Sequence, residues 1–476
     1  MPLWGDEVML ALNFLDRTPG NILDPLENGQ VAPPLFIFTS WLVVQYIGNS
    51  EWLLRFIPTI ASVAALLLMY RLTVKTLGRE QALIAVGLLA VSYYTIRYGA
   101  EFKPYSLDLL MSLIVLFVGY QYREAPSNKL RTFTFISVLP LATFASFPVV
   151  FVVGSVLFAL CVDGISRKAW RQLSTAMLAG TLTLVLFSIN YFYFIQIHST
   201  ENIILKTIWQ DAFPPKDLIG FFAWFIEQSS GRIMAYPHGG GNYKSLLTFL
   251  LALGGAGVLW RQGRHFFTTL LVMPFLLTVL AAIFHAYPYG SSARIAQHLA
   301  PSICILAAVG LTSLFTGLAN TASKYQVCVR GICYFLLVLG LLGIGYSIYK
   351  PYKSTGDLEV RRVVDDFFQE FGCTHVSVPN AASRVPVNFR WYLSVSERAV
   401  FNARIETNLD PGIQQICILY FDSNNFPVQT MQLNKQIQAL SKRMDVKLDL
   451  EKSIQIYGSN ELSHLYRQVI LAQQKS

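Results

Sequence analysis

Charged side chains are scarce in this sequence. Asp, Glu, Lys and Arg make up 14% of its 476 residues, whereas hydrophobic residues make up 53%. Soluble globular proteins carry roughly 25% charged residues, so this composition excludes an ordinary soluble enzyme. The apolar residues come in blocks of about 18 to 22, the length that spans a hydrocarbon core of roughly 30 Å. We therefore expect a polytopic α-helical membrane protein.

Metal-binding and cofactor-binding motifs are also missing. The six cysteines form no CxxC motif and there is no HExxH sequence, so a structural zinc site is not indicated. No glycine-rich loop follows a predicted strand, which argues against a Rossmann-type cofactor site. Cys373 and Cys417 lie in the polar tail, where they would pair only in an oxidising compartment. The remaining cysteines lie in or beside apolar blocks and are interpreted as small hydrophobic residues.

The net charge of +9 does not indicate a nucleic-acid-binding protein. The Lys and Arg residues fall between the apolar blocks instead of forming a basic stripe with aromatic residues. About ten spans with loose boundaries are predicted from their length and apolar character. They cover residues 54–72, 81–97, 105–121, 133–148, 148–162, 173–193, 244–260, 266–285, 299–318 and 331–349.

Basic residues concentrate in alternate connections between these spans. The positive-inside rule places these connections on the cytoplasmic side. The basic residues concerned are Arg71, Lys75, Arg79, Arg123, Lys129, Arg131, Arg167, Lys168, Arg171, Arg261, Arg264, Lys324 and Arg330. The opposite side, which we expect to be the periplasmic face of a bacterial inner membrane, then receives residues 1–53, the loop at 194–243 and the tail at 350–476. Because an outer N-terminal segment normally needs a preceding span, we expect a first transmembrane helix before Met1. The alternative is an N-terminal segment that is translocated without one.

The chain is thus predicted to have three parts: an outer segment over 1–53, a transmembrane domain over 54–349, and a C-terminal domain over 350–476. The last part alternates helix and strand patterns and is predicted to be a small α/β domain. Its predicted helices cover residues 357–371, 428–444 and 461–473. Its predicted strands cover Thr374–Pro379, Gln415–Phe421 and Ser453–Tyr457.

The first candidate site is the pair Asp6 and Glu7. Adjacent carboxylates near a low-dielectric region raise each other's pKa, and such a carboxylate can accept a proton from an acceptor hydroxyl. The alternative is that the pair favours the dipole at the start of a helix. After it, Pro33-Pro34 opens an aromatic apolar run that ends at Trp52, which we interpret as a juxtamembrane helix.

The second candidate is the segment from Arg97 to Asp108, between two predicted spans. It concentrates four ionisable residues at membrane depth, where such groups are costly and usually functional: Arg97, Glu101, Lys103 and Asp108. A carboxylate beside two cations suits an anionic phosphate. The alternative is an ion pair that only joins two helix ends.

The third candidate is the segment from Tyr287 to His298, in which Arg294 lies about one helical turn before His298. An arginine at the outer mouth of a span can hold a lipid phosphate. The alternative is an arginine that extends to the headgroups. The loop at 194–243 contains several aromatic residues and a glycine run, which suit a lid over a sugar. An ordinary interfacial loop explains the same composition.

In this order, the segments resemble the GT-C superfamily of integral-membrane glycosyltransferases. The motifs that carry the resemblance are the acidic pair, the Pro-Pro-Leu helix, Ser50–Pro58, Glu101–Tyr105 and the Tyr-Pro…Arg294 segment that ends at Pro301. The similar branch contains the bacterial protein mannosyltransferase-like and lipid A aminoarabinose transferase-like proteins. Lys103 stands where many relatives have Arg, which keeps the charge but loses the bidentate fork.

The resemblance implies inverting sugar transfer from a polyprenyl-phosphate donor to a glycan, lipid or protein acceptor. It implies Asp6, Glu7 or Glu101 as catalytic carboxylates. A divalent metal is compatible with such a site, although nothing in the sequence requires one. From their positions, we expect phosphate binding by Lys103, Arg294, Arg97 and His298, and substrate contacts by Tyr105 and Tyr287. A lipid or polysaccharide transporter is the rival interpretation, but transporters gather their charges near the midplane.

Overall fold

The chain divides into two compact units in the computed structural model. Unit 1 contains Met1–Asp16 and Tyr349–Ser476, and unit 2 contains Arg17–Ile348. Each unit is described by itself. The structure describes residues 3, 5–15, 17–27, 29–196, 209–239, 241–318, 322–349, 375–377, 415–423, 444–458 and 461–474.

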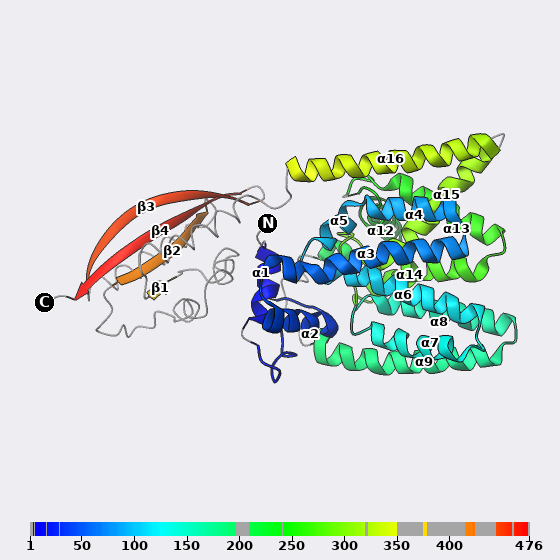
Figure 1. Cartoon of the computed structure of the whole chain (residues 1–476), viewed down its shortest axis with the longest axis horizontal. Coiled ribbons are helices and arrows are strands. Elements are labelled where there is room, and N and C mark those ends of the chain that lie inside the picture. The colour runs from blue at the N-terminus through cyan, green and yellow to red at the C-terminus, as the bar shows by residue number, and fades with distance from the viewer. Residues whose placement is uncertain are drawn as a thin grey trace. The chain divides into compact units, whose positions relative to one another are not determined.

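Unit 2 is a bundle of helices that run in alternating directions (Figure 1). Its long helices are α3 (Glu51–Thr76), α4 (Arg79–Ala90), α6 (Tyr105–Glu124), α7 (Lys129–Ala142), α8 (Val149–Ser166), α9 (Trp170–Asn190), α13 (Leu246–Arg261), α14 (His265–Ile283), α15 (Ala300–Leu318) and α16 (Ala322–Tyr349). Its shorter elements are α2 (Pro34–Leu42), η2 (Val43–Ile47), α5 (Tyr93–Gly99), η3 (Tyr191–Ile195), η4 (Gln210–Ala212), α12 (Leu218–Glu227), η5 (Gln228–Ile233) and η6 (Gln297–Leu299). Every predicted span therefore contains a helix.

Among the described residues, 7 helices are long and apolar enough to cross a membrane, and the bent pair of α4 and α5 raises the number to 8. The protein is therefore an integral membrane protein. Two predicted spans are shorter helices: α7 has 14 residues and α13 has 16. The apolar helix Pro34–Ile47 is also below the length of a span, as a juxtamembrane helix requires.

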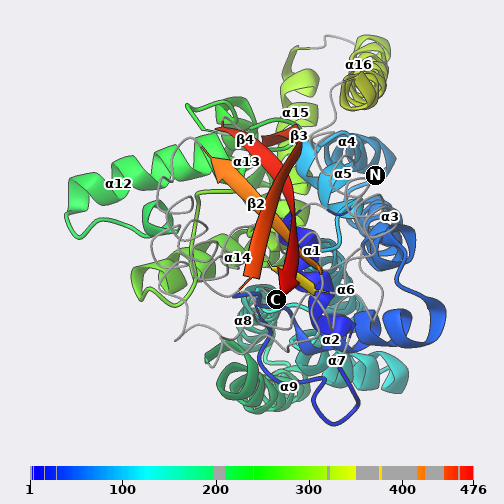
Figure 2. The same cartoon turned by 90° about the vertical axis from the view of Figure 1, so that its left-hand side faces the viewer.

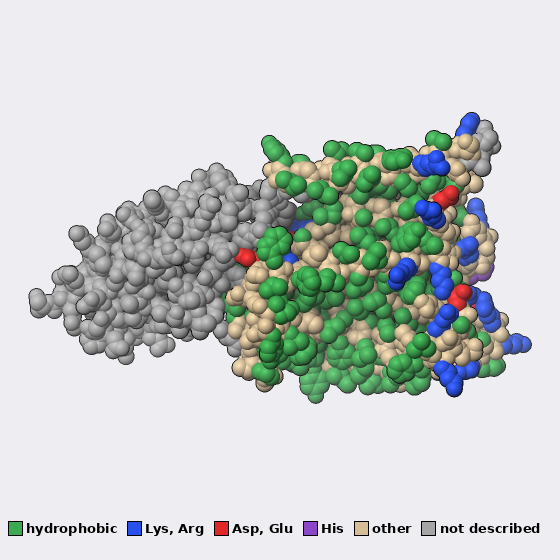
Figure 3. Space-filling view, in the orientation of Figure 1, with side chains coloured by type: hydrophobic (Ala, Val, Ile, Leu, Met, Phe, Trp, Pro, Cys, Tyr) green, Lys and Arg blue, Asp and Glu red, His purple; other side chains and the backbone are tan. Residues whose placement is uncertain are grey.

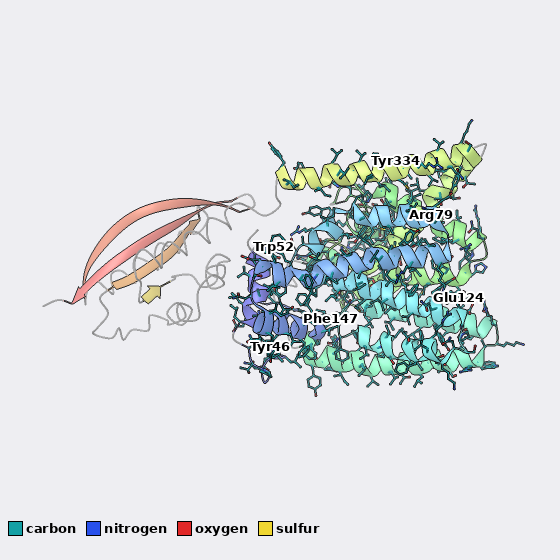
Figure 4. The ribbon with its side chains drawn as sticks, in the orientation of Figure 1. Tyr46, Trp52, Arg79, Glu124, Phe147 and Tyr334 are labelled. Carbon is teal, nitrogen blue, oxygen red and sulfur yellow. The ribbon has the colours of Figure 1, made fainter. Side chains whose placement is uncertain are left out.

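The two ends of the bundle differ in side-chain type. Lys and Arg side chains gather at the end where α3 meets α4 and α6 meets α7, whereas the flanks are covered by hydrophobic side chains (Figure 3). Arg79 and Glu124 lie at this basic end, and Tyr46 and Trp52 lie at the opposite one (Figure 4). Tyr46 is 74% exposed and Trp52 is 80% exposed, as expected for aromatic residues at a membrane interface.

At the basic end, Asp163 joins three helices. Its carboxylate pairs with Arg123 of α6 at 3.1 Å and with Arg167 at 3.2 Å, and it accepts a hydrogen bond from Gln172 of α9. The Asp163 side chain is 9% exposed. Because removal of one partner leaves a buried charge uncompensated, this network fixes the helix connections at the basic end.

Helix α15 is the central helix and α16 is a peripheral one. Of the most apolar window in each, 72% is buried in α15 and 11% in α16. Two glycines let α13 and α15 approach each other closely: a Cβ atom on Gly255 would collide with the carbonyl of Leu306, and one on Gly310 with that of Leu251. Viewed along the bundle, α16 lies at the edge, beside α15 and α4 (Figure 2).

The described part of unit 1 contains α1 (Gly5–Ala11), η1 (Leu12–Phe14) and a four-stranded sheet of order β1-β2-β4-β3. The strands are β1 (His375–Ser377), β2 (Gln415–Ser423), β3 (Met444–Gly458) and β4 (Glu461–Gln474). β1 and β2 are parallel, and the other pairs are antiparallel. The strands predicted over Gln415–Phe421 and Ser453–Tyr457 are confirmed.

The closing helix predicted over 461–473 is wrong, because these residues form β4. Leucine and isoleucine recur there at helical spacing, but β4 pairs with β3 along its whole length, from Glu461 opposite Gly458 to Gln474 opposite Met444. Cross-strand pairing thus outweighs the local periodicity. The helix predicted at 357–371, residues 428–443 of the next predicted helix, and Cys373 lie outside the described residues.

Candidate functional site

A buried ion pair occupies the connection between α5 and α6. Arg97 lies in the last turn of α5, and its Nε donates to Oε1 of Glu101 at 2.7 Å. The side chains of Arg97 and Glu101 are 13% and 3% exposed. The guanidinium also lies over the rings of Tyr93 and Tyr98, at 5.8 and 5.4 Å. Such aromatic faces stabilise a guanidinium that is removed from water.

Hydroxyl groups of neighbouring helices fix this connection. Thr59 of α3 donates to the carbonyl oxygen of Gly99 at 2.8 Å, and Ser106 of α6 donates to the carbonyl oxygen of Tyr98 at 2.6 Å. Ser62 lies so close to Gly99 that a Cβ atom there would come within 2.8 Å of its hydroxyl. The position of the ion pair is therefore set by contacts that require a glycine and small hydroxyl residues.

A bend between α4 and α5 determines where Arg97, in the last turn of α5, is placed. α4 and α5 together form one predicted span, but their axes are bent by 64° at the break between them. The carbonyl oxygen of Leu88 accepts a hydrogen bond from the Ser92 hydroxyl at 2.8 Å, which satisfies one group at the break. The bend places the tyrosine-rich α5 across the end of the bundle instead of continuing α4.

Lys103 is placed differently from Arg97. It is 5% exposed, and its Nζ donates to Oε1 of Gln30 at 2.7 Å. Gln30 belongs to a loop that is organised by Arg17, whose guanidinium donates to the carbonyl oxygens of Asn21, Ile22, Asp24 and Pro25. Burial lowers the pKa of Arg17, and the nearby carboxylates of Asp24 and Glu27 oppose this effect. Nothing in the local sequence indicates Gln30 as a partner of Lys103.

The second cluster lies in the segment between α14 and α15. Arg294 lies over the ring of Trp209, at 4.8 Å. Tyr287 donates from its hydroxyl to the carbonyl oxygen of Ile295 at 2.7 Å, and His298 Nε2 lies 3.0 Å from the hydroxyl of Thr278 in α14. His298 is 1% exposed. Arg294 is half-buried against Trp209, whereas His298 joins the start of α15 to α14.

The two clusters meet at the end of the bundle. Tyr98 packs against Tyr105 with ring centroids 4.7 Å apart, and it lies within electrostatic range of Arg97, Glu101 and Arg294. Burial raises the pKa of Tyr287 well above its usual value, and the neighbouring Asp108 and Tyr105 raise it further. The segments 97–108 and 287–298 are far apart in the sequence. The fold unites them in one site that contains cations, a carboxylate and phenols.

Asp108 belongs to this site, although the sequence assigns it no separate role. It is 5% exposed and, among the described residues, it forms no ion pair. Its carboxyl group lies near the Ser146 hydroxyl and within electrostatic range of Tyr287. The sequence did not show that the Asp108 carboxyl group is buried in the bundle without a paired cation, among the described residues.

Asp6 and Glu7 lie in unit 1, in the first turn of α1. Glu7 is buried and Asp6 is half-buried. This position matches the interpretation of an acidic pair at a helix start, and it leaves their catalytic role a prediction. Among the residues that the structure describes, no group of three His, Cys, Asp or Glu side chains is arranged to hold a metal.

Part of the loop at 194–243 packs against the segment between α14 and α15. Trp224 is 8% exposed, and its Nε1 donates to the carbonyl oxygen of Asp211 at 3.0 Å. Its ring lies against Tyr289, with centroids 5.8 Å apart. Gly241 lies beside η5, because its amide donates to the carbonyl oxygen of Gly231 at 3.0 Å. The loop is thus part of the wall of the site.

Comparison with known proteins bears on this fold. Residues 31–193 match the sequence model of the family described as dolichyl-phosphate-mannose-protein mannosyltransferase. No curated protein sequence matches the chain. The chain is similar to the crystal structure of ArnT from Cupriavidus metallidurans bound to undecaprenyl phosphate, with a TM-score of 0.51 and 13% identity over 98% of this chain and 94% of that one.

Two further solved structures are similar to a lesser degree. The same ArnT in the apo state has a TM-score of 0.49 and 12% identity over 98% of this chain and 93% of that one. The apo oligosaccharyltransferase of Archaeoglobus fulgidus has a TM-score of 0.43 and 13% identity over 85% of this chain and 61% of that one. The predicted resemblance is confirmed, and the chain has the fold of the GT-C glycosyltransferases.

Proposed function

We propose that this protein transfers a sugar from a polyprenyl-phosphate donor to an acceptor on the outer face of the membrane. The observation that carries the proposal is the meeting of Arg97, Glu101 and Arg294 among tyrosines at one end of an apolar bundle. Cations at the ends of spans suit a phosphate whose lipid chain lies in the membrane. The similar ArnT structure holds undecaprenyl phosphate, which is a ligand of this class.

The outer face is supported by the distribution of charge. The site lies at the end of the bundle opposite the connections that are rich in Lys and Arg (Figures 1 and 3). Basic connections remain on the cytoplasmic side of bacterial membranes. The site then faces the periplasm, where the donor sugar is carried by a lipid instead of a nucleotide.

The proposed reaction is an inverting displacement at the anomeric carbon. The acceptor oxygen forms a bond to this carbon while the bond to the phosphate oxygen breaks, and the lipid phosphate leaves with the electron pair. Arg294, Arg97 and Lys103 stabilise the negative charge that develops on the phosphate. Glu101 of unit 2, or Asp6 or Glu7 of unit 1, accepts the acceptor proton.

The reaction is tested with purified protein in lipid nanodiscs and a panel of radiolabelled polyprenyl-phosphate sugars. Transfer to membrane glycans, lipids or added protein is measured for the wild type, Arg294→Gln and Glu101→Gln. Lys216→Gln is the control, because Lys216 is an exposed cation of the loop at 194–243 and is not one of the proposed site residues. We expect a loss of at least about 100-fold in Glu101→Gln and Arg294→Gln, and none in Lys216→Gln. Equal transfer by all four proteins would contradict the proposal.

A further inference from the structure

The turn before Arg294 has an unusual backbone. Gly290 has φ of 112° and Ser291 has φ of 58°, so two successive residues occupy the left-handed region. For a serine this conformation is uncommon and costs free energy unless other groups hold it. The turn lies between α14 and η6, and it reaches Arg294 three residues later.

Two side chains of η5 form hydrogen bonds to both backbone polar groups of Ser291, its amide and its carbonyl oxygen. The amide of Ser291 donates to Oε1 of Gln228 at 2.7 Å, and the carbonyl oxygen of Ser291 accepts from Nη1 of Arg232 at 3.0 Å. A Cβ atom on Gly290 would collide with the Gln228 side chain. Next to it, the hydroxyl groups of Ser229 and Tyr289 lie 2.9 Å apart. The left-handed serine is therefore fixed by partners from another element.

Gln228 is suited to this task because it cannot move freely. It is 3% exposed and lies at the start of a π-helical turn, a distortion that often occurs at functional sites. A buried amide oxygen that loses its partner is costly, so the contact with Ser291 is strongly favoured. The contact joins residues 63 positions apart in the sequence.

The turn transmits this fixation to Arg294. The amide of Arg294 donates to the hydroxyl of Ser292 at 3.3 Å, and its guanidinium lies over Trp209. If Ser291 relaxes from the left-handed region, the chain direction changes between the turn and Arg294. The guanidinium then leaves the place where it lies near Tyr98.

We propose that Gln228 and Arg232 are positioning residues that set the guanidinium of Arg294 for an anionic lipid phosphate. We call the two hydrogen bonds that Gln228 and Arg232 form with the backbone of Ser291 the clamp. The ligand class rests on the proposed function, whereas the clamp does not. Neither residue needs to touch the substrate. The outer loop thus contributes to phosphate binding through the backbone of another segment.

The clamp is tested first without a ligand. Trp209 is one of eight tryptophans, so its emission is obtained as the difference between each protein and the same protein with Trp209→Phe. Gln228→Leu removes the acceptor at similar size, Arg232→Met removes the donor, and Gln228→Glu keeps the acceptor. We expect acrylamide to quench Trp209 more strongly in Gln228→Leu and Arg232→Met, and as in the wild type in Gln228→Glu. Unchanged quenching in both of the first two variants overturns the clamp.

The second measurement is the affinity for undecaprenyl phosphate in nanodiscs. Loss of the acceptor is expected to raise Kd about tenfold, whereas Gln228→Glu stays within about twofold of the wild type. The added change Ser291→Gly in Gln228→Leu should recover part of the affinity, because glycine adopts the left-handed region without cost. A structural role alone would lower thermal stability and leave Kd of the folded protein unchanged, which overturns the proposal. If the wild type does not bind this lipid, the proposed function fails, while the quenching experiment still decides the clamp.

Discussion

The ion pair between Arg97 and Glu101 allows a structural role to be separated from a catalytic one. Glu101→Gln removes the negative charge but keeps the size and an acceptor oxygen. The pair is short, at 2.7 Å, and its side chains are 13% and 3% exposed. Removing one partner of a buried pair costs about 3–5 kcal/mol, because the other charge stays buried and uncompensated. Because the glutamine keeps an acceptor oxygen for Arg97, we expect Glu101→Gln to lower the free energy of unfolding by about 3 kcal/mol, the lower end of this range.

The double variant Arg97→Met/Glu101→Gln removes both charges. Replacing a whole buried pair with uncharged side chains of similar volume is often nearly neutral, so its stability should return to within about 1 kcal/mol of the wild type. The two substitutions are then strongly non-additive, as expected for groups in direct contact. Thermal unfolding in nanodiscs measures this coupling.

Sugar transfer by the same proteins decides the role of the pair. If the pair only joins two helix ends, activity recovers together with stability in the double variant. If it belongs to the reaction site, activity stays at least about 100-fold below the wild type although stability returns. Recovery of both quantities would refute the assignment of Arg97 and Glu101 to the site.

Three further predictions concern packing, the basic end and pH. Gly255→Leu should destabilise the fold by more than about 2 kcal/mol, because the new side chain meets backbone atoms of α15, whereas Gly257→Leu, which faces open space, should be nearly neutral in thermal unfolding. Asp163→Asn should cost about 1–3 kcal/mol and leave transfer per folded molecule unchanged, and the exposed Glu124→Gln is its control. The pKa of Tyr287 is raised on folding, so the folded state keeps a proton that the unfolded state loses, and stability should fall by up to about 1.4 kcal/mol per pH unit above pH ~10. Tyr287→Phe should weaken that dependence, and an unchanged slope in urea titrations between pH 9 and pH 11 would contradict it.

The sequence predicted the elements of the site better than their partners. Length and apolar character indicated the spans, and charges at their ends indicated Arg97, Glu101 and Arg294. These signals are local, and they persist in the fold because membrane helices must bury their polar groups. The bend between α4 and α5 carries no proline or glycine at its break, where Val91 and Ser92 lie, so the pattern resembled one straight span.

Contacts between distant segments were not predictable. Lys103 is bound to Gln30, 73 residues away, and the acceptor of Ser291 is Gln228, 63 residues away. A glutamine amide can both donate and accept hydrogen bonds, so it has many potential partners, and only the assembled bundle selects one. The strand β4 was missed for the same reason, because its pairing with β3 is a non-local interaction that its own periodicity does not express.

The close approach of α13 and α15 limits how the site can adapt to a ligand. Where backbone touches backbone at Gly255 and Gly310, neither helix can rotate about its axis or slide without a collision. Helix α15 therefore keeps a fixed position relative to α13. Any adjustment of Arg294 to ligands of different size has to come from the short stretch between α14 and α15. Under the proposed function, the range of donors that bind is then set by a few backbone torsion angles and not by movement of the bundle.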